Sequence, residues 1–295
     1  MTQAPTLLLC VGATKAGTTW LYEHLSAHPQ CHLRAIKELH YFDTLENCGF
    51  TRQLKVQRAF AARLQKRLGV VQGEQAERVA QKLRDVKEWI GVLAARVEDV
   101  PAYLSYLSGG RGARPVVADI TPAYALLPED RLRQMAGMAP DVRVLYVMRD
   151  PVSRLWSHVR MLASRAAEGA DRVPDRAFAL LDRILAGETS GATERGDYIA
   201  ALTKLWAAVD PKRLLVMFQE EMLTGAGLAR LCAFLGIAPA TADFGSRVHA
   251  GPALALSDSQ RNRARALLRP QYEFVARHYP DLPGAWRRNM GEETL

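Results

Sequence analysis

A short loop bounded by glycines near the N-terminus carries side chains suited to bind an anion. Residues 12–20 are Gly-Ala-Thr-Lys-Ala-Gly-Thr-Thr-Trp, between an apolar run that predicts a buried strand and a segment that predicts a helix. Glycines let backbone N–H groups approach an anion, and the helix dipole favours negative charge there. Gly12 and Gly17 have P-loop spacing, but Thr18 stands where a P-loop has its lysine, and the lysine is Lys15, inside the loop. This order predicts a phosphate loop adapted to a different donor.

The segment Lys15-Ala-Gly-Thr-Thr-Trp20 resembles the 5′-phosphosulfate loop of sulfotransferases that use 3′-phosphoadenosine 5′-phosphosulfate (PAPS). The resemblance implies PAPS as donor, 3′-phosphoadenosine 5′-phosphate (PAP) as product, and Lys15 as the cation beside the oxygen that leaves sulfur. The residues it implies for donor binding here are Ala13, Thr14, Lys15, Ala16, Gly17, Thr18, Thr19 and Trp20. In cytosolic relatives a tryptophan at the position of Trp20 stacks on adenine, and a core tryptophan is the alternative. For the whole loop, the alternative is a turn made by its glycines.

A second donor contact is predicted at Arg149 and Ser157, which lie eight residues apart. A strand is expected to end at Arg149, and Pro151 suits the first turn of a following helix, where its missing N–H costs nothing. A forked guanidinium and a hydroxyl two turns into the helix can hold one phosphate from two sides. The stretch resembles the sulfotransferase 3′-phosphate motif, which implies that both residues bind the 3′-phosphate of PAPS. The alternative is a surface ion pair of Arg149 with Asp150 and a serine on the helix surface.

The segment Lys37-Glu-Leu-His-Tyr-Phe-Asp43 combines two carboxylates with a lysine and a histidine. It resembles the K-E-x-H-[FY]-F-D segment of heparan sulfate sulfotransferases and their bacterial relatives, where the glutamate is the catalytic base. An acceptor hydroxyl must lose its proton as it attacks sulfur, and the resemblance implies Glu38 for this step. His40 is the alternative base, because the cytosolic enzymes use histidine. The resemblance also implies that His40 and Asp43 orient the acceptor and that Lys37 supports charge on the sulfuryl group, with ordinary surface polarity as the alternative for Lys37 and Asp43.

Two weaker matches extend the resemblance. Asp119-Ile-Thr-Pro-Ala-Tyr124 resembles a turn that lines the acceptor cleft, which implies acceptor contacts for Thr121 and Tyr124. Its isoleucine replaces a lysine of the heparan sulfate enzymes, which argues against simply transferring their acceptor. Arg195 is implied near the 3′ end of the nucleotide, with a simple loop arginine as the alternative. The loop that closes over the nucleotide in many relatives has only a loose counterpart at 247–251.

The pattern along the chain alternates strand and helix, which predicts an α/β fold with a mostly parallel central sheet flanked by helices. Short apolar runs predict buried strands at Thr6–Val11, Pro115–Ala118, Val142–Met148 and Arg213–Phe218. We expect a single domain, 1–295, with a P-loop-like phosphosulfate loop and a helical C-terminal tail at about 250–295. Residues 163–193 are expected to insert a helix and a following loop.

A helical insertion is expected at about 51–107, because this region is almost without strand signals and spaces its apolar residues as a helix does. Gly69 and Gly73 should divide it into two helices that end before Pro101. The basic residues of its first helix are Arg52, Lys55, Arg58, Arg63, Lys66 and Arg67. We favour a solvated charged face for them, and an acceptor-binding surface is the alternative.

Composition fits an enzyme with an anionic ligand. The chain has 295 residues, 48% of them hydrophobic, and 39 Lys+Arg against 31 Asp+Glu, a net charge of +8. No nucleic-acid-binding pattern is present, so nucleic acid is not an expected partner. The four cysteines have no metal-ligand spacing, and no segment resembles a signal sequence or membrane span. These features favour a cytoplasmic protein with reduced thiols.

The sequence therefore predicts a PAPS-dependent sulfotransferase that acts on a hydroxyl or amine of a carbohydrate, lipid or small metabolite. We expect no metal requirement, because a sulfuryl group carries less negative charge than a terminal phosphoryl, and because Arg149 stands where a Mg²⁺-holding carboxylate would end the strand. One alternative is a P-loop nucleotide kinase, which Thr18 and Arg149 disfavour. The other is a non-catalytic module that binds PAP or a polyanion, which Lys15 and Glu38 disfavour. The acceptor and the oligomeric state stay open.

Overall fold

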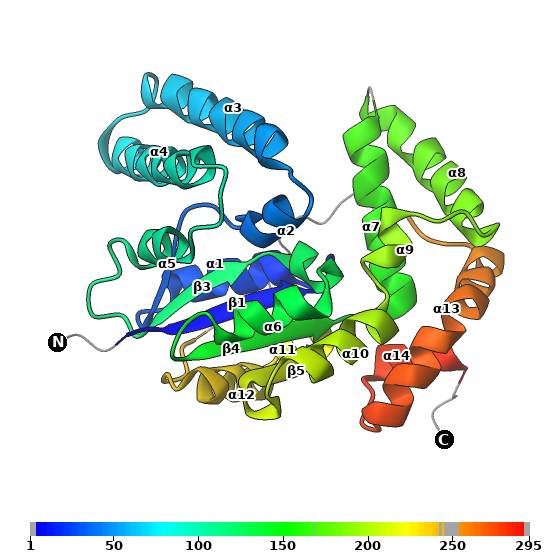
Figure 1. Ribbon diagram of the computed structural model, residues 1–295. Helices are drawn as coiled ribbons and strands as arrows, with labels where there is room; N and C mark the ends of the chain where they lie inside the picture. The colour runs from blue at the N-terminus through cyan, green and yellow to red at the C-terminus, as the bar shows by residue number, and fades with distance from the viewer. Residues whose placement is uncertain (1–3, 168, 242–243, 245–253, 292–295) are drawn as a thin grey trace.

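A parallel sheet lies at the centre of the computed structural model, which describes residues 4–167, 169–241, 244 and 254–291 (Figure 1). In this part of the chain the strands are β1 Thr6–Gly12, β2 Cys31–Leu33, β3 Val116–Ile120, β4 Val142–Met148 and β5 Leu214–Phe218. Their order is β2-β3-β1-β4-β5, and each neighbouring pair is parallel. The predicted α/β fold is confirmed. The sequence pattern missed β2 because three residues are too few to show a period.

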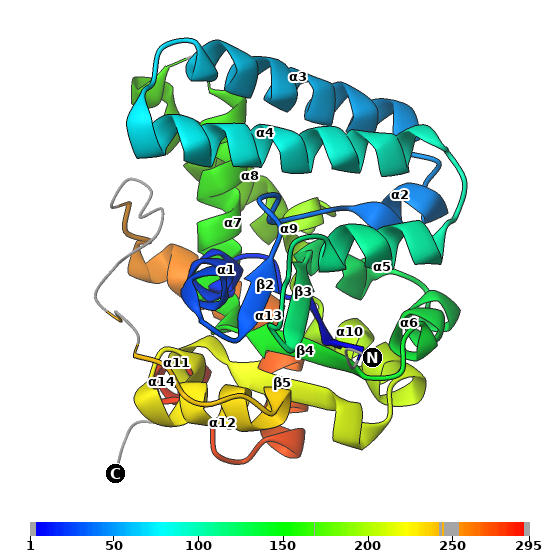
Figure 2. The same ribbon diagram turned by 90° about the vertical axis from the view of Figure 1, so that its left-hand side faces the viewer.

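Helices cover both faces of this sheet. Figure 2 shows α1 and α12 on one side and α6 and α10 on the other. The α-helices are α1 Thr18–Ala27, α2 Tyr41–Glu46, α3 Phe50–Leu68, α4 Gly73–Ala94, α5 Val100–Ser108, α6 Glu129–Gly137, α7 Pro151–Ala166, α8 Val173–Leu185, α9 Gly191–Glu194, α10 Tyr198–Ala208, α11 Gln219–Met222, α12 Gly225–Leu235, α13 Asp258–His278 and α14 Gly284–Met290. Short 3₁₀ turns are η1 Pro122–Leu126, η2 Ala170–Arg172 and η3 Pro211–Arg213. In the described part of the chain, no helix is long and apolar enough to cross a membrane.

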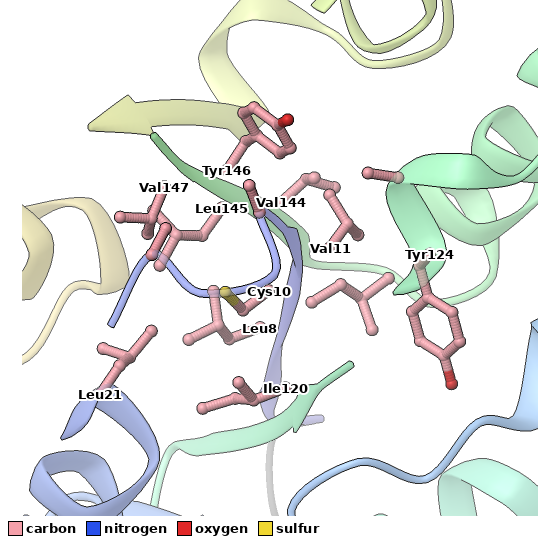
Figure 3. Packing of buried hydrophobic residues seen from close by; sticks show 14 of the residues in the cluster. Leu8, Cys10, Val11, Leu21, Ile120, Tyr124, Val144, Leu145, Tyr146 and Val147 are labelled. Carbon is pink, nitrogen blue, oxygen red and sulfur yellow. The ribbon is translucent and has the colours of Figure 1, made fainter. Parts of the chain in front are cut away.

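The core is built around β1, which pairs with β3 on one side and β4 on the other. Figure 3 shows Leu8 and Cys10 of β1 close to Ile120 of β3 and Leu145 of β4. A strand enclosed in this way must be apolar along its whole length, which is the pattern that its sequence shows. The rigid centre of the sheet therefore fixes the position of the loop that follows β1.

The region expected to be a helical insertion contains three helices instead of two. Helices α3 and α4 pack against each other and are separated at Gly69 and Gly73, as predicted. Pro101 does not follow the last helix but lies in the first turn of α5. Proline is tolerated there because the first N–H groups of a helix have no intrahelical partner, and Asp99 caps the amide of Ala102 at 2.9 Å.

The other regions outside the strand–helix alternation are helical as well. In the 163–193 region, α7 continues to Ala166, and α8 is followed by a connection to the short helix α9. The described part of the C-terminal tail consists of α13 and α14. Helix α13 packs against α7 and α10 (Figure 1), and α14 contacts the same region through Asn289, which donates a hydrogen bond to Asp150, and Trp286, which stacks on Tyr198.

Candidate active site

Two glycines shape the loop between β1 and α1. A Cβ atom on Gly12 would lie 2.2 Å from Cε2 of Tyr146 on β4, so a side chain cannot be placed there without moving that ring. Gly17, immediately before α1, has a φ of +84°, in the left-handed region that glycine enters without a Cβ penalty. The loop backbone therefore leads directly into the N-terminus of α1, where the helix dipole favours an anion.

The remaining loop residues divide into those that hold its shape and those that can reach a ligand. The amide of Ala13 donates to the main-chain oxygen of Val147 at 2.7 Å, and the amide of Ala16 donates to the main-chain oxygen of Ala13 at 3.2 Å. Both alanines are buried, so we expect them to shape the loop rather than contact a donor directly. The half-buried side chains that can reach a ligand are those of Thr14, Lys15 and Thr19.

Cations gather around Lys15. Nη1 of Arg149, at the end of β4, donates to the main-chain oxygen of Lys15 at 3.2 Å, which ties the two predicted donor contacts together. Burial lowers the pKa of Lys15, and the nearby positive charges of Arg149, Arg165, Arg160 and Lys37 lower it further. Because these cations repel one another, an anion bound among them would be strongly stabilised.

Ser157 lies in the second turn of α7 and is half-buried. The start of this helix is fixed by Asp150, whose Oδ1 accepts a hydrogen bond from the amide of Ser153 at 2.8 Å. Asp150 also accepts from Tyr272 Oη at 2.5 Å and from Asn289 Nδ2 at 2.9 Å. Asp150 is completely buried, so the alternative of a surface ion pair with the preceding arginine is wrong. The tail helices thus position the helix that carries Ser157.

Arg195 lies between α9 and α10, beside the same elements. It is half-buried and lines a pocket with Lys204. Burial lowers the pKa of the α7 residue His158 to about 3, and positive charge from nearby cations, Arg195 and Lys15 among them, contributes. Tyr198, three residues after Arg195, contacts the end of β4: its Oη donates to the main-chain oxygen of Arg149 at 2.5 Å and accepts from the amide of Arg149 at 3.1 Å. Arg195 and Lys15 thus both act electrostatically on His158, and a contact of Arg195 with the nucleotide stays a prediction.

The 37–43 segment forms a chain of polar contacts that starts at the phosphate loop. Nζ of Lys37 donates to Oγ1 of Thr18 at 3.3 Å and to Oε1 of Glu38 at 2.7 Å. The other carboxylate oxygen of Glu38 lies 3.4 Å from Nε2 of His40. Nδ1 of His40 lies 2.7 Å from Oδ2 of Asp43. The structure therefore brings the four predicted side chains of this segment together with the first residue of α1.

These contacts determine the charge of the two candidate bases. Burial alone would raise the pKa of Glu38, but a hydrogen bond with His40 and the charge of Lys37 lower it to about 2. Burial would lower the pKa of His40, but hydrogen bonds with Asp43 and Glu38 raise it to about 9. At neutral pH the carboxylate is ionised and can accept a proton, whereas the imidazole already carries one.

This charge state of His40 predicts a pH dependence of stability. The pKa of His40 is 6.5 in the unfolded chain and about 9 in the folded one, so protonated His40 stabilises the fold below 6.5 and this contribution disappears as the pH rises through 9. We expect His40→Gln to lower the free energy of unfolding, relative to wild type, by on the order of 1–2 kcal/mol near pH 6, after allowance for solvent screening. Urea unfolding of both proteins across this range measures the difference, and a difference that grows above pH 9 would contradict the assignment.

Thr121 and Tyr124 lie behind this segment and hold it in place. Oγ1 of Thr121 and Oη of Tyr124 donate to the buried carboxylate of Asp119 at 2.6 and 2.8 Å. The same two oxygens accept hydrogen bonds from the amides of Leu39 and Tyr41, each at 3.0 Å. Both side chains are completely buried, which differs from their predicted place on the wall of an acceptor cleft. We expect them to position the 37–43 segment rather than to contact the acceptor.

Trp20 lies among other aromatic rings. It is buried and stacks on His24, with ring centroids 5.3 Å apart, and on Phe244 at 5.9 Å. This placement favours the core alternative for Trp20, and adenine stacking stays a prediction. The 247–251 counterpart of the nucleotide-closing loop lies outside the described residues.

Comparison with known proteins excludes one of the predicted classes of function. The sequence profile described as the sulfotransferase family matches residues 7–241, which include the phosphate loop, the 37–43 segment and the start of α7. The chain belongs to the sulfotransferase family. This membership excludes the nucleotide kinase considered above, and the nearer resemblance to heparan sulfate enzymes stays a prediction. A search of curated proteins returned no match.

Solved structures support the same fold for this sulfotransferase. A sulfotransferase from Alicyclobacillus acidocaldarius superposes with a TM-score of 0.61 at 19% identity, covering 97% of this chain and 100% of that one. The sulfotransferase domain from the curacin biosynthetic pathway has a TM-score of 0.50 at 18% identity, covering 98% and 97%. At these identities the likeness concerns the arrangement of elements.

Several residues of the site were not predicted from the sequence of this sulfotransferase. Asp119 anchors the 37–43 segment, and Arg160 and Arg165 of α7 add positive charge near Lys15. Arg160 could have been found, because it lies three residues after Ser157, about one helical turn along α7. Among the described residues, no group of three or more His, Cys, Asp or Glu side chains could hold a metal ion.

Proposed function

We propose that this sulfotransferase moves the sulfuryl group of PAPS to a hydroxyl or amine of its acceptor, with Glu38 as the general base. The observation that carries the proposal is the chain of contacts from Thr18 through Lys37 to Glu38, at 3.3 and 2.7 Å. It places a candidate base two side chains from the N-terminus of the helix that follows the phosphate loop. In-line transfer requires this proximity, because the acceptor must attack sulfur while the donor phosphate is held.

The donor end of the site would be held by residues from three elements. Lys15 and the loop amides stabilise the charge that develops on the phosphate as the S–O bond of the donor breaks. Arg149 and Ser157 take the 3′-phosphate, with Arg195 near the same end of the nucleotide. The cluster of mutually repelling cations around Lys15 supports this assignment, since PAPS is strongly anionic.

At the acceptor end, Glu38 takes the proton of the attacking hydroxyl or amine as the new bond to sulfur forms, and PAP leaves. His40 is proposed to orient the acceptor as a hydrogen-bond donor, because its raised pKa keeps the ring protonated at neutral pH. Asp43 holds that ring through Nδ1. Lys37 can exchange its contact with Glu38 for an oxygen of the sulfuryl group, which would return basicity to the carboxylate when the donor is bound.

Binding of PAP without Mg²⁺ is the direct test of the donor assignment. A ligand that binds only the folded state must stabilise it, by about 2.7 kcal/mol at a hundredfold excess over Kd. We expect PAP to raise the Tm equally with Mg²⁺ and with EDTA, because the proposed phosphate contacts are cationic side chains and amides. A differential scanning fluorimetry series with PAP, adenosine and inorganic sulfate measures this. No shift at about millimolar PAP would refute the nucleotide assignment.

A transfer assay separates an enzyme from a non-catalytic binding module. Transfer of radiolabelled sulfate from PAPS, screened across hydroxyl and amine acceptors of the carbohydrate, lipid and small-metabolite classes, reports turnover directly. Tight PAP binding with no transfer to any acceptor class would favour the module.

A further inference from the structure

The outer face of α3 concentrates positive charge. The helix Phe50–Leu68 contains no Asp or Glu. Its exposed basic side chains are Arg52, Lys55, Arg58, Arg63, Lys66 and Arg67. Within the described residues, none of the six forms an ion pair with a carboxylate. Like charges on a protein surface favour solubility through mutual repulsion, but they also attract an anionic ligand long enough to contact several of them.

Helix geometry places these cations on the half of α3 that faces away from the protein. The buried residues Leu54, Gln57 and Leu64 fall on one side of the helix, which packs against α4. At 100° per residue the basic residues fall on the opposite half, over a helix about 28 Å long. Neighbouring α4 differs, because its bases alternate with acids, as in the ion pair of Arg78 with Glu74 at 2.7 Å. An ordinary solvated face resembles α4, so α3 requires another explanation.

The basic helix continues directly from the candidate acceptor site. Asp43 lies in α2, and only residues 47–49 separate α2 from α3. Figure 1 shows the first turn of α3 beside α2 and the rest of the helix running outward from there. An acceptor whose reacting group lies at Glu38 and whose remainder extends past α2 would therefore meet Arg52 first and the other cations in turn.

We propose that the outer face of α3 binds an acidic polysaccharide, one of whose hydroxyl or amine groups is the acceptor. This inference rests on the proposed function. Such a polysaccharide carries the nucleophilic group that the site requires, and its repeated anionic groups can neutralise the basic side chains of α3. An anionic membrane fits less well, because the cations spread over half the helix circumference and Val56, half exposed, is the one large apolar side chain exposed on α3.

Two variants with the same net charge separate a local surface from a general charge effect. The α3 variant combines Arg52→Gln, Lys55→Gln, Arg63→Gln and Lys66→Gln. The matched control combines Lys212→Gln, Arg269→Gln, Arg277→Gln and Arg287→Gln, all exposed and away from α3. Each set lowers the net charge of +8 by four, to +4. Glutamine is a good helix former, so the helices should persist in both proteins.

Fluorescence anisotropy with labelled polygalacturonate, at about 50 mM salt where screening is weak, measures binding. We expect the α3 variant to bind at least roughly tenfold more weakly than wild type, the control to lose less than about threefold, and the salt dependence of binding to become shallower only in the α3 variant. Neutral dextran should not bind. Equal losses in the two variants would overturn the proposal, and so would α3-dependent binding to phosphatidylglycerol vesicles or duplex DNA that exceeds binding to polygalacturonate.

The Tm shift with PAP keeps the two proposals apart. A normal PAP shift in the α3 variant shows that the protein is folded and that the loss concerns the polysaccharide alone. A wild-type protein that responds to PAP but does not bind polygalacturonate overturns the inference about α3 and leaves the proposed function standing. Absence of the PAP shift in wild type overturns the proposed function itself.

Discussion

Glu38→Gln should lower kcat by roughly 10²–10⁴-fold, because an amide keeps the shape of the side chain but cannot accept the acceptor's proton. PAP affinity should change by less than about threefold, since Glu38 contacts Lys37 and His40 rather than the phosphate loop. Steady-state transfer from radiolabelled PAPS, together with PAP titrations, gives both numbers. Glu23→Gln is a matched control, because it removes the same charge from an exposed position on α1.

His40→Ala provides the decisive contrast with Glu38→Gln. We expect this variant to raise the acceptor KM more than it lowers kcat, since the protonated ring is proposed to orient the acceptor. If His40→Ala abolishes turnover while Glu38→Gln keeps most of it, the base is histidine. The charge states inferred from the contacts within the 37–43 segment would then be wrong.

Ser157→Ala and Arg149→Ala should each weaken PAPS binding by roughly 10–100-fold, which corresponds to the loss of one charge-assisted contact to a phosphate. Adenosine 5′-phosphosulfate lacks the 3′-phosphate, so its affinity should change little in Ser157→Ala. Arg149→Ala should affect it somewhat more, because Arg149 also donates to the main-chain oxygen of Lys15. Calorimetric titration of both nucleotides measures the ratio of the two losses.

A control for this pair lies on the same helix. Ser164 is exposed near the C-terminal end of α7, so Ser164→Ala should leave both affinities unchanged. Equal losses for PAPS and adenosine 5′-phosphosulfate in Ser157→Ala would show that the hydroxyl supports the structure of the site and does not bind the 3′-phosphate.

The sequence predicted those parts of the protein whose cause is local. The P-loop-like loop was visible because glycine is required where φ is positive, as at Gly17, and where a neighbouring ring approaches, as at Gly12. The central strand was visible because a strand enclosed by two neighbours is apolar throughout. The 37–43 segment was visible as a motif, and the contacts within it join residues one to three positions apart.

The tertiary structure alone decided how these parts are held together. Asp150 is fixed by Tyr272 and Asn289, which lie 122 and 139 residues away, and no local pattern records such a pairing. Thr121 and Tyr124 looked like acceptor contacts, yet their hydroxyls are enclosed between Asp119 and the backbone of the 37–43 segment. Residue types indicate which side chains can take part in chemistry, but burial decides which of them can contact a ligand and which hold the others in position.

The charge of the candidate bases was likewise beyond the sequence. The sequence resemblance implied Glu38 as the base and left His40 as the alternative, but residue types alone could not decide the protonation state of either side chain, since both ionise within the working range of enzymes. The structure separates them, because Lys37 and His40 hold Glu38 ionised while Asp43 and Glu38 hold His40 protonated. The sequence by itself determined which motifs carry the phosphate loop and the two candidate bases. The three-dimensional arrangement determined their protonation, because a pKa depends on distances of a few ångströms and on exclusion of water, and neither is encoded in spacing along the chain.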